Sequence, residues 1–295
     1  MSTETATPIP GVCAIVINYF GCEKTERCLK SLRGQQLAKL VLIDNSADTQ
    51  EQAKLRQLVA DVGPSLGFPV EPRNNTQNLG FGRAVNAGIQ QDIRSTGGHL
   101  HYLLLNNDAE ATPDLVSGLM QAIAADPTRL LVSPRIQWGP ESVCYHYYQP
   151  YLGHVTTSPF PGSFRYLSGC CLLVDSRALV DERLFDEDFF MYGEDAELSY
   201  RLSQRGWRIY CADHLLAKHE GSGSSGSGTA LYEYYTARSH LQMARKQPGL
   251  VPKLLAYAGR SAYLPARAAL RAARQSRATP ITRLLAALLH SSRRP

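Results

Sequence analysis

Short apolar runs alternate with segments of helical periodicity through the first 125 residues. The run "VCAIVIN" at 12–18 is rich in β-branched residues, which is typical of a strand buried in a parallel sheet. The segment 22–35 then carries Leu29 and Leu32 on one helical face, and 40–45 is a second apolar run. This alternation predicts successive β-α units.

The alternation continues to residue 125. It predicts a helix at 49–62, a weak strand at 68–74, a helix at 79–93, a strand at 102–108 and a helix at 113–125. Pro113 suits the first position of the last helix, because a proline there gives up no helical hydrogen bond. The repeated order predicts an α/β fold with a mostly parallel sheet and helices on both faces.

The pattern is less regular after residue 131. We expect a strand at 130–138, loops and short strands at 141–162, a strand and helix within 168–179, a helix at 193–206 closed by Gly206, and a strand at 207–213. The Gly/Ser stretch at 220–230 predicts a flexible loop. We place the main domain at 1–249 and a helical tail at 250–295.

Composition adds little to this picture. The chain has 295 residues, of which 44% are hydrophobic, and no run of 18 uninterrupted apolar residues that could span a bilayer. The first residues, "MSTETATPIPG", lack the features of a signal peptide. The seven cysteines form no CxxC pair, which favours buried free thiols in a reducing, cytoplasmic compartment.

The charge is divided unevenly along the chain. Glu233 is the last acidic residue, and 12 Lys or Arg follow it. Residues 1–233 carry 19 basic and 26 acidic residues, so the body is acidic and the tail basic. A basic tail favours phosphates, either those of lipid headgroups or those of nucleic acid.

Three of the predicted strands end in polar residues. Ligands of open α/β sheets bind beyond the carboxyl ends of the strands, and a carboxylate there can accept hydrogen bonds from a ribose or a base. Each residue alone could equally form an Asx turn or cap a helix. The residues are Asn18 and Tyr19, Asp44 and Asn45, and Asn106, Asn107 and Asp108.

Asp108 and a second acidic cluster are candidates for chemistry. A carboxylate beside other oxygen ligands suits Mg²⁺ or Mn²⁺ bound together with a phosphate. In "FDEDFFMYGEDAELSYRL", Glu194 and Asp195 begin a predicted helix, where they could stabilise the helix end or act as a general base. His219 precedes the Gly/Ser stretch, whose mobility would suit a lid over a bound ligand.

Together these motifs resemble the family-2 glycosyltransferases, which have the GT-A (Rossmann-like) fold, and their bacterial rhamnosyltransferase-like branch. The resemblance covers about residues 12 to 240. Its seven pieces occur in family order: "VINYFGCEKTERCLKSL", "VLIDNSAD", "NNTQNLGFGRAVNAGI", "YLLLNNDA", "SGCCLLVDSRAL", "FDEDFFMYGEDAELSYRLSQRGWRI" and "KHEGSGS".

The resemblance implies a role for each matching residue. Asp195, with Glu194 beside it, is implied as the catalytic base of an inverting enzyme. Asp108, Asn106 and His219 are implied as the site of Mg²⁺ or Mn²⁺, with Asn106 standing where the family motif has an acidic residue. The nucleotide-sugar would be held by Asn18, Tyr19, Asp44, Asn45, Asn78, Gly80, Arg83, Asn86 and Asn107.

The tail predicts two basic amphipathic helices. In the second, Thr279 is expected to cap the helix and Pro280 to open it. An apolar stripe with helical spacing follows, surrounded by arginines, and such a helix can lie in the headgroup layer of an anionic membrane. Packing against the domain or in a dimer is the alternative. The stripe comprises Ile281, Leu284, Leu285, Leu288 and Leu289.

The sequence therefore predicts an inverting glycosyltransferase on the inner face of the bacterial inner membrane. By resemblance, the donor is dTDP-L-rhamnose and the acceptor a lipid-linked or lipopolysaccharide glycan. A UDP-hexose donor and a non-catalytic nucleotide-sugar-binding protein are the alternatives. A nucleic-acid partner is disfavoured, because the tail has few aromatic residues for base stacking. "GFG" at 80–82 lacks the glycine spacing of a dinucleotide-binding loop.

Overall fold

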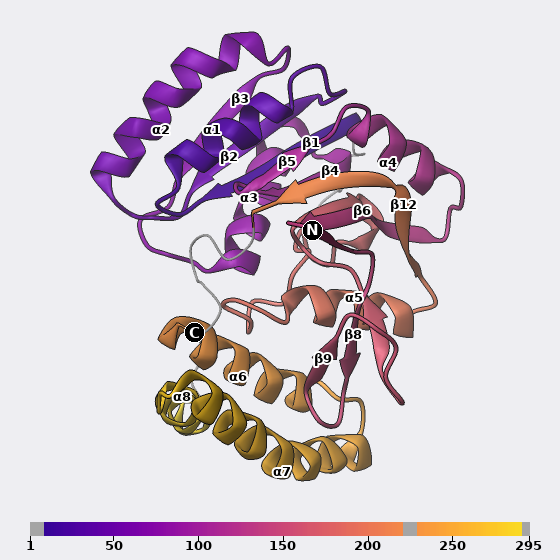
Figure 1. Ribbon diagram of the computed structural model, residues 1–295. Helices are drawn as coiled ribbons and strands as arrows, with labels where there is room; N and C mark the ends of the chain where they lie inside the picture. The colour runs from indigo at the N-terminus through magenta and orange to yellow at the C-terminus, as the bar shows by residue number, and fades with distance from the viewer. Residues whose placement is uncertain (1–8, 221–228, 291–295) are drawn as a thin grey trace, which may run out of the picture.

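A nine-stranded sheet forms the centre of the computed structural model, which describes residues 9–220 and 229–290. The strand order is β3-β2-β1-β4-β11-β6-β12-β5, with β7 paired to β6 (Figure 1). The first four strands alternate with helices, as the sequence predicts. Their bounds are β1 (Ile9–Asn18), α1 (Cys22–Ser31), β2 (Lys39–Asp44), α2 (Thr49–Val62), β3 (Val70–Asn74), α3 (Phe81–Thr96) and β4 (His99–Asn106).

The second half of the sheet is mixed. Strand β11 runs antiparallel to both β4 and β6, whereas β12 runs parallel to β6. Strands β5 and β7 are also antiparallel to their neighbours, so six of the nine strands share one direction. The elements are β5 (Ala109–Ala111), α4 (Leu115–Ala124), β6 (Arg129–Trp138), β7 (Glu141–Val143), β11 (Cys171–Asp175), α5 (Glu194–Gln204) and β12 (Arg208–His219).

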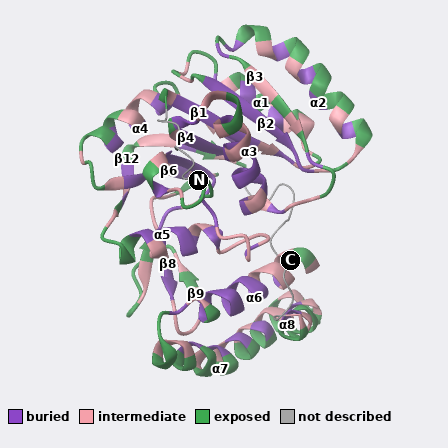
Figure 2. Ribbon diagram, turned by 180° about the vertical axis from the view of Figure 1, so that it is seen from behind, coloured by how far each residue is buried: buried purple, intermediate pink, exposed green. Residues whose placement is uncertain are grey.

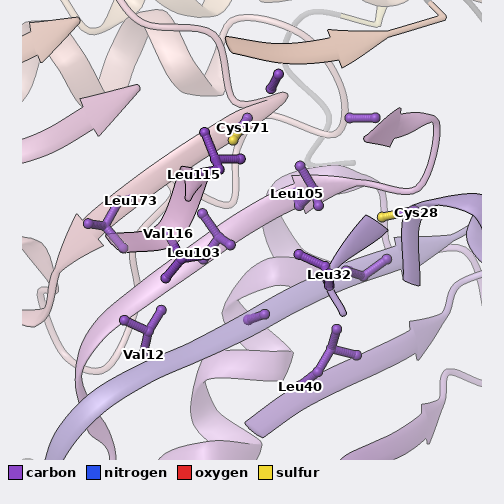
Figure 3. Close-up of a cluster of buried hydrophobic side chains, with 14 of the residues drawn as sticks. Val12, Cys28, Leu32, Leu40, Leu103, Leu105, Leu115, Val116, Cys171 and Leu173 are labelled. Atoms are coloured by element: carbon purple, nitrogen blue, oxygen red, sulfur yellow. The ribbon is translucent and has the colours of Figure 1, made fainter. Parts of the chain in front are cut away.

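Helices cover both faces of the sheet, which confirms the predicted α/β architecture. One apolar cluster joins the strands to α1, α2 and α4, and a second joins them to α3 and α5. Figure 3 shows part of the first cluster, where Leu103 and Leu105 of β4 lie near Leu115 and Val116 of α4. Burial on both faces explains why the central strands are continuous apolar runs.

Three element boundaries differ from the sequence predictions. Helix α4 begins at Leu115, because Asp114 adopts a left-handed conformation (φ 62°) and separates Pro113 from the helix. The helix expected after β11 is a single 3₁₀ turn, Ser176–Ala178. Strand β12 extends to His219, beyond the predicted end at 213, after a register shift.

A smaller antiparallel sheet lies between β7 and β11 in the chain. Its order is β10-β8-β9, with β8 (His146–Gln149), β9 (His154–Thr156) and β10 (Phe164–Tyr166). These are the short strands expected within 141–162, extended by one strand. Tyr148 and Tyr166 are buried with Phe189 and Met243, so this sheet packs between the main domain and the C-terminal helices.

Three helices form the C-terminal part: α6 (Ala230–Arg245), α7 (Leu250–Gln275) and α8 (Thr279–Leu289). They lie together at one side of the molecule (Figure 1). Helix α6 was not predicted, and it packs with the other two, so the helical part begins before residue 250. The shared apolar cluster comprises Ala237, Leu241, Leu264, Ala268, Leu284 and Ala287.

The apolar stripe of α8 is divided between two environments. Leu284 is buried against α6 and α7, whereas Leu285 and Leu289 are exposed. Thr279 is the first helical residue rather than the cap, which is Ala278. The Gly/Ser stretch lies mostly at 221–228, outside the described residues, and no helix that the structure describes is long and apolar enough to cross a membrane.

Candidate active site

The sheet register brings the polar strand ends to one edge. Asn18 pairs in register with Asp44, Asp44 pairs with Asn74, and Asn106 lies opposite Ile17. Strand β1 has β2 on one side and β4 on the other, so the chain reverses its strand order here. Such a reversal is where open α/β sheets bind ligands.

Asn18 makes the most side-chain hydrogen bonds at this edge. Its side chain is fully buried and its amide oxygen accepts from Thr25 Oγ1 at 2.8 Å. Its amide nitrogen donates to Glu51 Oε1 at 3.1 Å and lies 3.4 Å from Asp44 Oδ1. Asn107 donates to Thr25 Oγ1 at 3.1 Å, which ties β4 to the same network. Asn18 and its partners therefore hold the end of β1 against α1, α2 and the end of β4.

Asp44 and Asn45 lie at the end of β2, next to Asn18. The Asp44 carboxylate accepts the Ser46 hydroxyl at 2.9 Å, and the side chain is nearly fully buried. Asn45 donates to Asn78 Oδ1 at 2.9 Å and accepts from the Leu79 backbone N–H at 3.0 Å. These bonds hold the segment before α3 against the end of β2. Beyond β1, Tyr19 packs edge-on to the exposed Phe20 ring.

Gly80 makes a close approach that no larger residue could make. It has a φ of 77°, and a Cβ built on it would lie 2.1 Å from the Phe190 carbonyl oxygen. The next residue, Phe81, donates its N–H to that same oxygen at 2.9 Å. The start of α3 is therefore in direct backbone contact with the loop that leads to Asp195.

Two further residues of α3 hold this loop. Asn86 accepts the Leu184 and Phe185 N–H groups and donates to the Phe185 carbonyl, at 2.9 to 3.0 Å. Arg83 Nε donates to the Glu187 carbonyl at 3.0 Å. In this structure, the predicted nucleotide-sugar residues of α3 thus also position residues 184–190.

Asp108 follows β4 and pairs with His219 at the end of β12. His219 Nε2 lies 3.0 Å from Asp108 Oδ1, and both side chains are about one-tenth exposed. Burial alone would raise the pKa of Asp108, but the hydrogen bond and charge of His219, together with Lys24, hold this pKa below its ordinary value. The carboxylate is therefore ionised, as a metal ligand must be.

Trp138 belongs to this group and was missed by the sequence reasoning. Its indole N–H donates to His219 Nδ1, and its ring also lies 5.7 Å from His146. Strand register explains the contact, because Gln137 pairs with Lys218 in the parallel β6–β12 pair. Trp138 therefore orients the imidazole toward Asp108.

Glu194 and Asp195 begin α5, as predicted. Asp195 remains partly exposed and accepts the Ala196 N–H at 2.8 Å and the Gly169 N–H at 3.3 Å. Burial raises the pKa of Asp195 despite these bonds, and burial together with the Asp195 charge raises the pKa of Glu194. Glu194 Oε2 is buried without a hydrogen-bond partner among the described residues.

Backbone contacts join Asp195 to the strand-end cluster. The Asn106 N–H donates to the Cys170 carbonyl at 2.8 Å, and Gly169 donates to Asp195. Gly169 and Cys170, adjacent residues just before β11, thus link the start of α5 to Asn106, the last residue of β4. The structure brings the predicted acidic residue and the predicted metal residues to the same edge.

Helix α6 supports the loop before Asp195 from the other side. Phe190 stacks on Tyr235 with ring centroids 4.6 Å apart, and Tyr192 packs edge-on to Tyr232 at 5.2 Å. Lys246, just after α6, forms ion pairs with Asp186 and with Asp188, the latter at 2.7 Å. The loop is therefore held between α3 and α6.

A family model described as "Glycosyl transferase family 2" matches residues 13–181. The chain belongs to glycosyltransferase family 2. The match covers the strand-end cluster and ends shortly before α5. This family 2 glycosyltransferase is 27% identical over 212 residues to the N-acetylglucosaminyl-diphospho-decaprenol L-rhamnosyltransferase of Mycobacterium tuberculosis. The matched region covers 59% of this chain and 69% of that relative.

Solved structures confirm the fold of this family 2 glycosyltransferase. It superposes on GalNAc-T7, solved with UDP, GalNAc and Mn²⁺, with a TM-score of 0.63 and 16% identity over 80% of this chain and 48% of the other. The mannosyltransferase PcManGT from Pyrobaculum calidifontis, solved with GDP-Man and Mn²⁺, gives a TM-score of 0.59 and 16% identity over 97% and 88%. The fold is of the GT-A type.

The residues at the ends of β4 and β12 fit a divalent cation. Asp108 supplies an ionised carboxylate, and Asn106, two residues earlier, supplies an amide oxygen. His219 Nε2, 3.0 Å from the same carboxylate, would supply a nitrogen ligand only in the tautomer that carries its proton on Nδ1, which gives up the bond from Trp138. Oxygen ligands with one nitrogen suit Mn²⁺, and the oxygens alone suit Mg²⁺.

Proposed function

We propose that this glycosyltransferase transfers a sugar, with inversion, from a nucleotide-sugar to a hydroxyl of a lipid-linked glycan. One observation carries the proposal: a partly exposed carboxylate, Asp195, lies at the sheet edge that also presents Asp44 and Asp108. Burial raises the pKa of Asp195, which makes it a stronger base than an ordinary aspartate. A base beside a nucleotide site is what transfer to a hydroxyl requires.

The nucleotide would lie over the ends of β1 and β2. Asp44 would accept hydrogen bonds from the ribose or base, and Tyr19 and Asn107 would border it. Asn18, Asn45 and the α3 residues described above would keep this surface rigid through their hydrogen bonds, in addition to the contacts with the donor that the resemblance implies.

The diphosphate would lie beside Asp108. Asp108, Asn106 and His219 would hold Mg²⁺ or Mn²⁺, which when bound offsets the negative charge of the departing nucleoside diphosphate. Trp138 keeps the His219 ring directed at Asp108 through its indole N–H. Asp108 is kept ionised by His219 and Lys24, so it is ready to bind a cation at neutral pH.

Asp195 would remove the proton of the acceptor hydroxyl. The freed oxygen attacks the anomeric carbon, the bond from that carbon to the diphosphate oxygen breaks, and the electron pair leaves with the nucleotide. Hydrogen bonds from Gly169 and Ala196 hold the carboxylate in place. Glu194 lies buried beside it, and burial together with the Asp195 charge raises the pKa of Glu194, so Glu194 stays protonated while Asp195 is ionised.

The finer assignment is dTDP-L-rhamnose as donor and a lipid-linked or lipopolysaccharide glycan as acceptor. The name of the mycobacterial relative supports both the sugar and a lipid-linked acceptor. A UDP-hexose donor is the alternative, because GalNAc-T7 was solved with UDP. Such an acceptor, together with the basic tail, supports a location on the inner face of the inner membrane.

A donor panel with an Asp195 variant tests the proposal. We expect dTDP-L-rhamnose with Mn²⁺ or Mg²⁺ to raise the melting temperature more than UDP-glucose, UDP-galactose, UDP-N-acetylglucosamine or GDP-mannose. Asp195→Asn should keep this shift and lose about 10³-fold in transfer rate, the usual scale of a general base. Full transfer activity in Asp195→Asn would refute the role of Asp195. Donor binding without transfer or hydrolysis in the wild-type protein would indicate the non-catalytic alternative.

A further inference from the structure

The outward face of α7 is apolar along nearly the whole helix. Every exposed residue from Leu250 to Ala273 is uncharged, and only Tyr257 and Ser261 carry a polar group. Leu254 and Leu255 are 56% and 53% exposed. The other exposed residues are Leu250, Val251, Ala258, Ala262, Pro265, Ala266, Ala269, Leu270 and Ala273. A helix face that meets water normally carries charge.

Three of the four arginines of this helix point inward instead. Arg260 is 2% exposed and donates to the Tyr148 hydroxyl at 3.1 Å. Arg267 lies 3.0 Å from His240, and Arg271 pairs with the buried Glu233 at 2.6 Å. Helix α7 therefore has the reverse of the usual arrangement, with arginines toward the protein and apolar groups toward the outside.

The exposed face of α8 continues this surface. Ile281, Leu285, Leu288 and Leu289 are all exposed, while Leu284 is buried against α6 and α7. Ten of the seventeen large apolar side chains that are exposed among residues 9–220 and 229–290 lie between Leu250 and Leu289. Figure 2 shows exposed residues along α7 and α8 at the edge of the molecule. A concentration of this kind marks an interaction surface.

Basic residues border the surface, and α7, α8 and the segment between them carry no acidic residue. Arg274, Arg277 and Arg283 are exposed where α7 meets α8, and the half-buried Lys253 lies near the other end of α7. The chain contains no Asp or Glu after Glu233. The partner must therefore combine an apolar interior with negative charge at its edge.

We propose that the exposed faces of α7 and α8, the outer surface defined by the residues above, insert into the headgroup region of an anionic lipid bilayer. The proposal rests on the proposed function and deepens it, because a lipid-linked acceptor lies in a bilayer. The basic border would meet lipid phosphates while the leucines enter the acyl boundary. A second copy of the chain fits less well, because a symmetric contact would bring two borders of like charge together without any acidic partner.

The position of α6 connects this surface to catalysis. Helix α6 packs against α7 and α8 on one side. On the other side, Tyr235 of α6 and Lys246, the residue just after it, contact the loop before Asp195. A bilayer bound at the outer surface would thus lie next to the helix that supports the catalytic loop, which suits an acceptor anchored in that bilayer.

Vesicle flotation tests the proposal with the full-length protein. The wild type should float with vesicles of phosphatidylcholine and phosphatidylglycerol and much less with phosphatidylcholine alone. Leu254→Glu combined with Leu255→Glu should lower the binding constant by about tenfold or more, because two half-exposed leucines no longer enter the acyl boundary. Leu100→Glu with Val180→Glu is the matched control, since these side chains are exposed elsewhere and should bind as wild type does.

Charge substitutions test the border separately. Arg274→Glu with Arg277→Glu should reduce binding to the anionic vesicles by at least about fivefold for each arginine removed from the surface. Arg56→Glu with Arg205→Glu, both exposed on the main domain, is the control. Equal loss in test and control pairs would overturn the proposal. A wild type that fails to float would also overturn it. So would a wild-type dimer that becomes monomeric in the Leu254→Glu, Leu255→Glu variant, because the surface would then be an interface between copies.

The thermal shift with dTDP and Mn²⁺ separates this proposal from the proposed function. Every variant should keep the wild-type shift, since none of the substitutions is in the nucleotide site. Loss of flotation with an unchanged shift assigns the defect to the outer surface. A wild type that floats but shows no shift supports the outer surface while contradicting the proposed nucleotide site.

Discussion

Replacement of Gly80 by alanine should damage both stability and activity. The backbone at Gly80 has a φ of 77°, and the added Cβ would lie 2.1 Å from the Phe190 carbonyl oxygen. Real Cβ atoms do not approach a carbonyl oxygen so closely, so α3 and the 185–193 loop must move apart. The hydrogen bond from Phe81 N–H to that carbonyl, now 2.9 Å, would be lost.

The cost of Gly80→Ala can be divided into parts. The backbone at Gly80, with φ 77° and ψ −178°, is a conformation nearly restricted to glycine and costs another residue about 1–3 kcal/mol, and loss of the hydrogen bond costs about 0.5–1.5 kcal/mol. Displacement of the loop adds to both. Gly67→Ala is the matched control, because Gly67 has a φ of 84° with no atom within 4 Å of the added Cβ. The control therefore reports the cost of a side chain at a positive φ without any close contact.

Urea unfolding and steady-state kinetics measure the two consequences. We expect Gly80→Ala to lose about 1–3 kcal/mol more than Gly67→Ala in the free energy of unfolding. We also expect kcat to fall at least about tenfold in Gly80→Ala, because a small misplacement of the base is costly, and to stay near wild type in Gly67→Ala. Equal effects of the two substitutions on stability and rate would refute the inferred contact between α3 and the catalytic loop.

Three further predictions concern the carboxylates and the loop. The rate should fall as pH decreases through the raised pKa of Asp195, at a pH above the ordinary aspartate value of about 3.9; an acid limb at or below that value would contradict the shift. Glu194→Gln should stabilise the protein at pH 8 by about 1 kcal/mol in urea unfolding, because the folded-state pKa of Glu194 is raised and its stability contribution is lost as pH rises through that pKa; unchanged stability across pH 5–8 would contradict it. Lys246→Met should lower kcat about threefold to tenfold, since Asp186 and Asp188 lose their ion pairs, with Lys218→Met, an exposed lysine of β12, as the control.

The strand ends could be predicted from the sequence for a simple geometric reason. Parallel strands joined by helices must present their carboxyl ends at one edge, so Asn18, Asp44 and Asn106 had to lie near one another once the strands were identified. The helix start at Glu194 was also readable, because acidic residues favour that position. The roles of these residues in binding and catalysis stay predictions.

The contact of Trp138 with His219 could not be read in the same way. It depends on the register of β6 against β12, which shifts between Ala212 and Leu216. Helix α6 was missed because it has no clear apolar stripe. It is surrounded on several sides, so polar residues such as Arg238, His240 and Gln242 are buried with the apolar ones.

The apolar cluster shared by α6, α7 and α8 favours surface substitution over truncation as the way to a more soluble protein for crystallisation. Deleting residues after Gly249 would expose Ala237 and Leu241, which now pack against Leu264 and Leu284. The shortened chain would lose the exposed apolar face of α7 and α8 but expose the apolar face of α6 instead. It would also remove the packing that supports α6, the helix that contacts the catalytic loop. Polar substitutions at Leu254 and Leu255 leave that cluster whole, since both side chains point away from it.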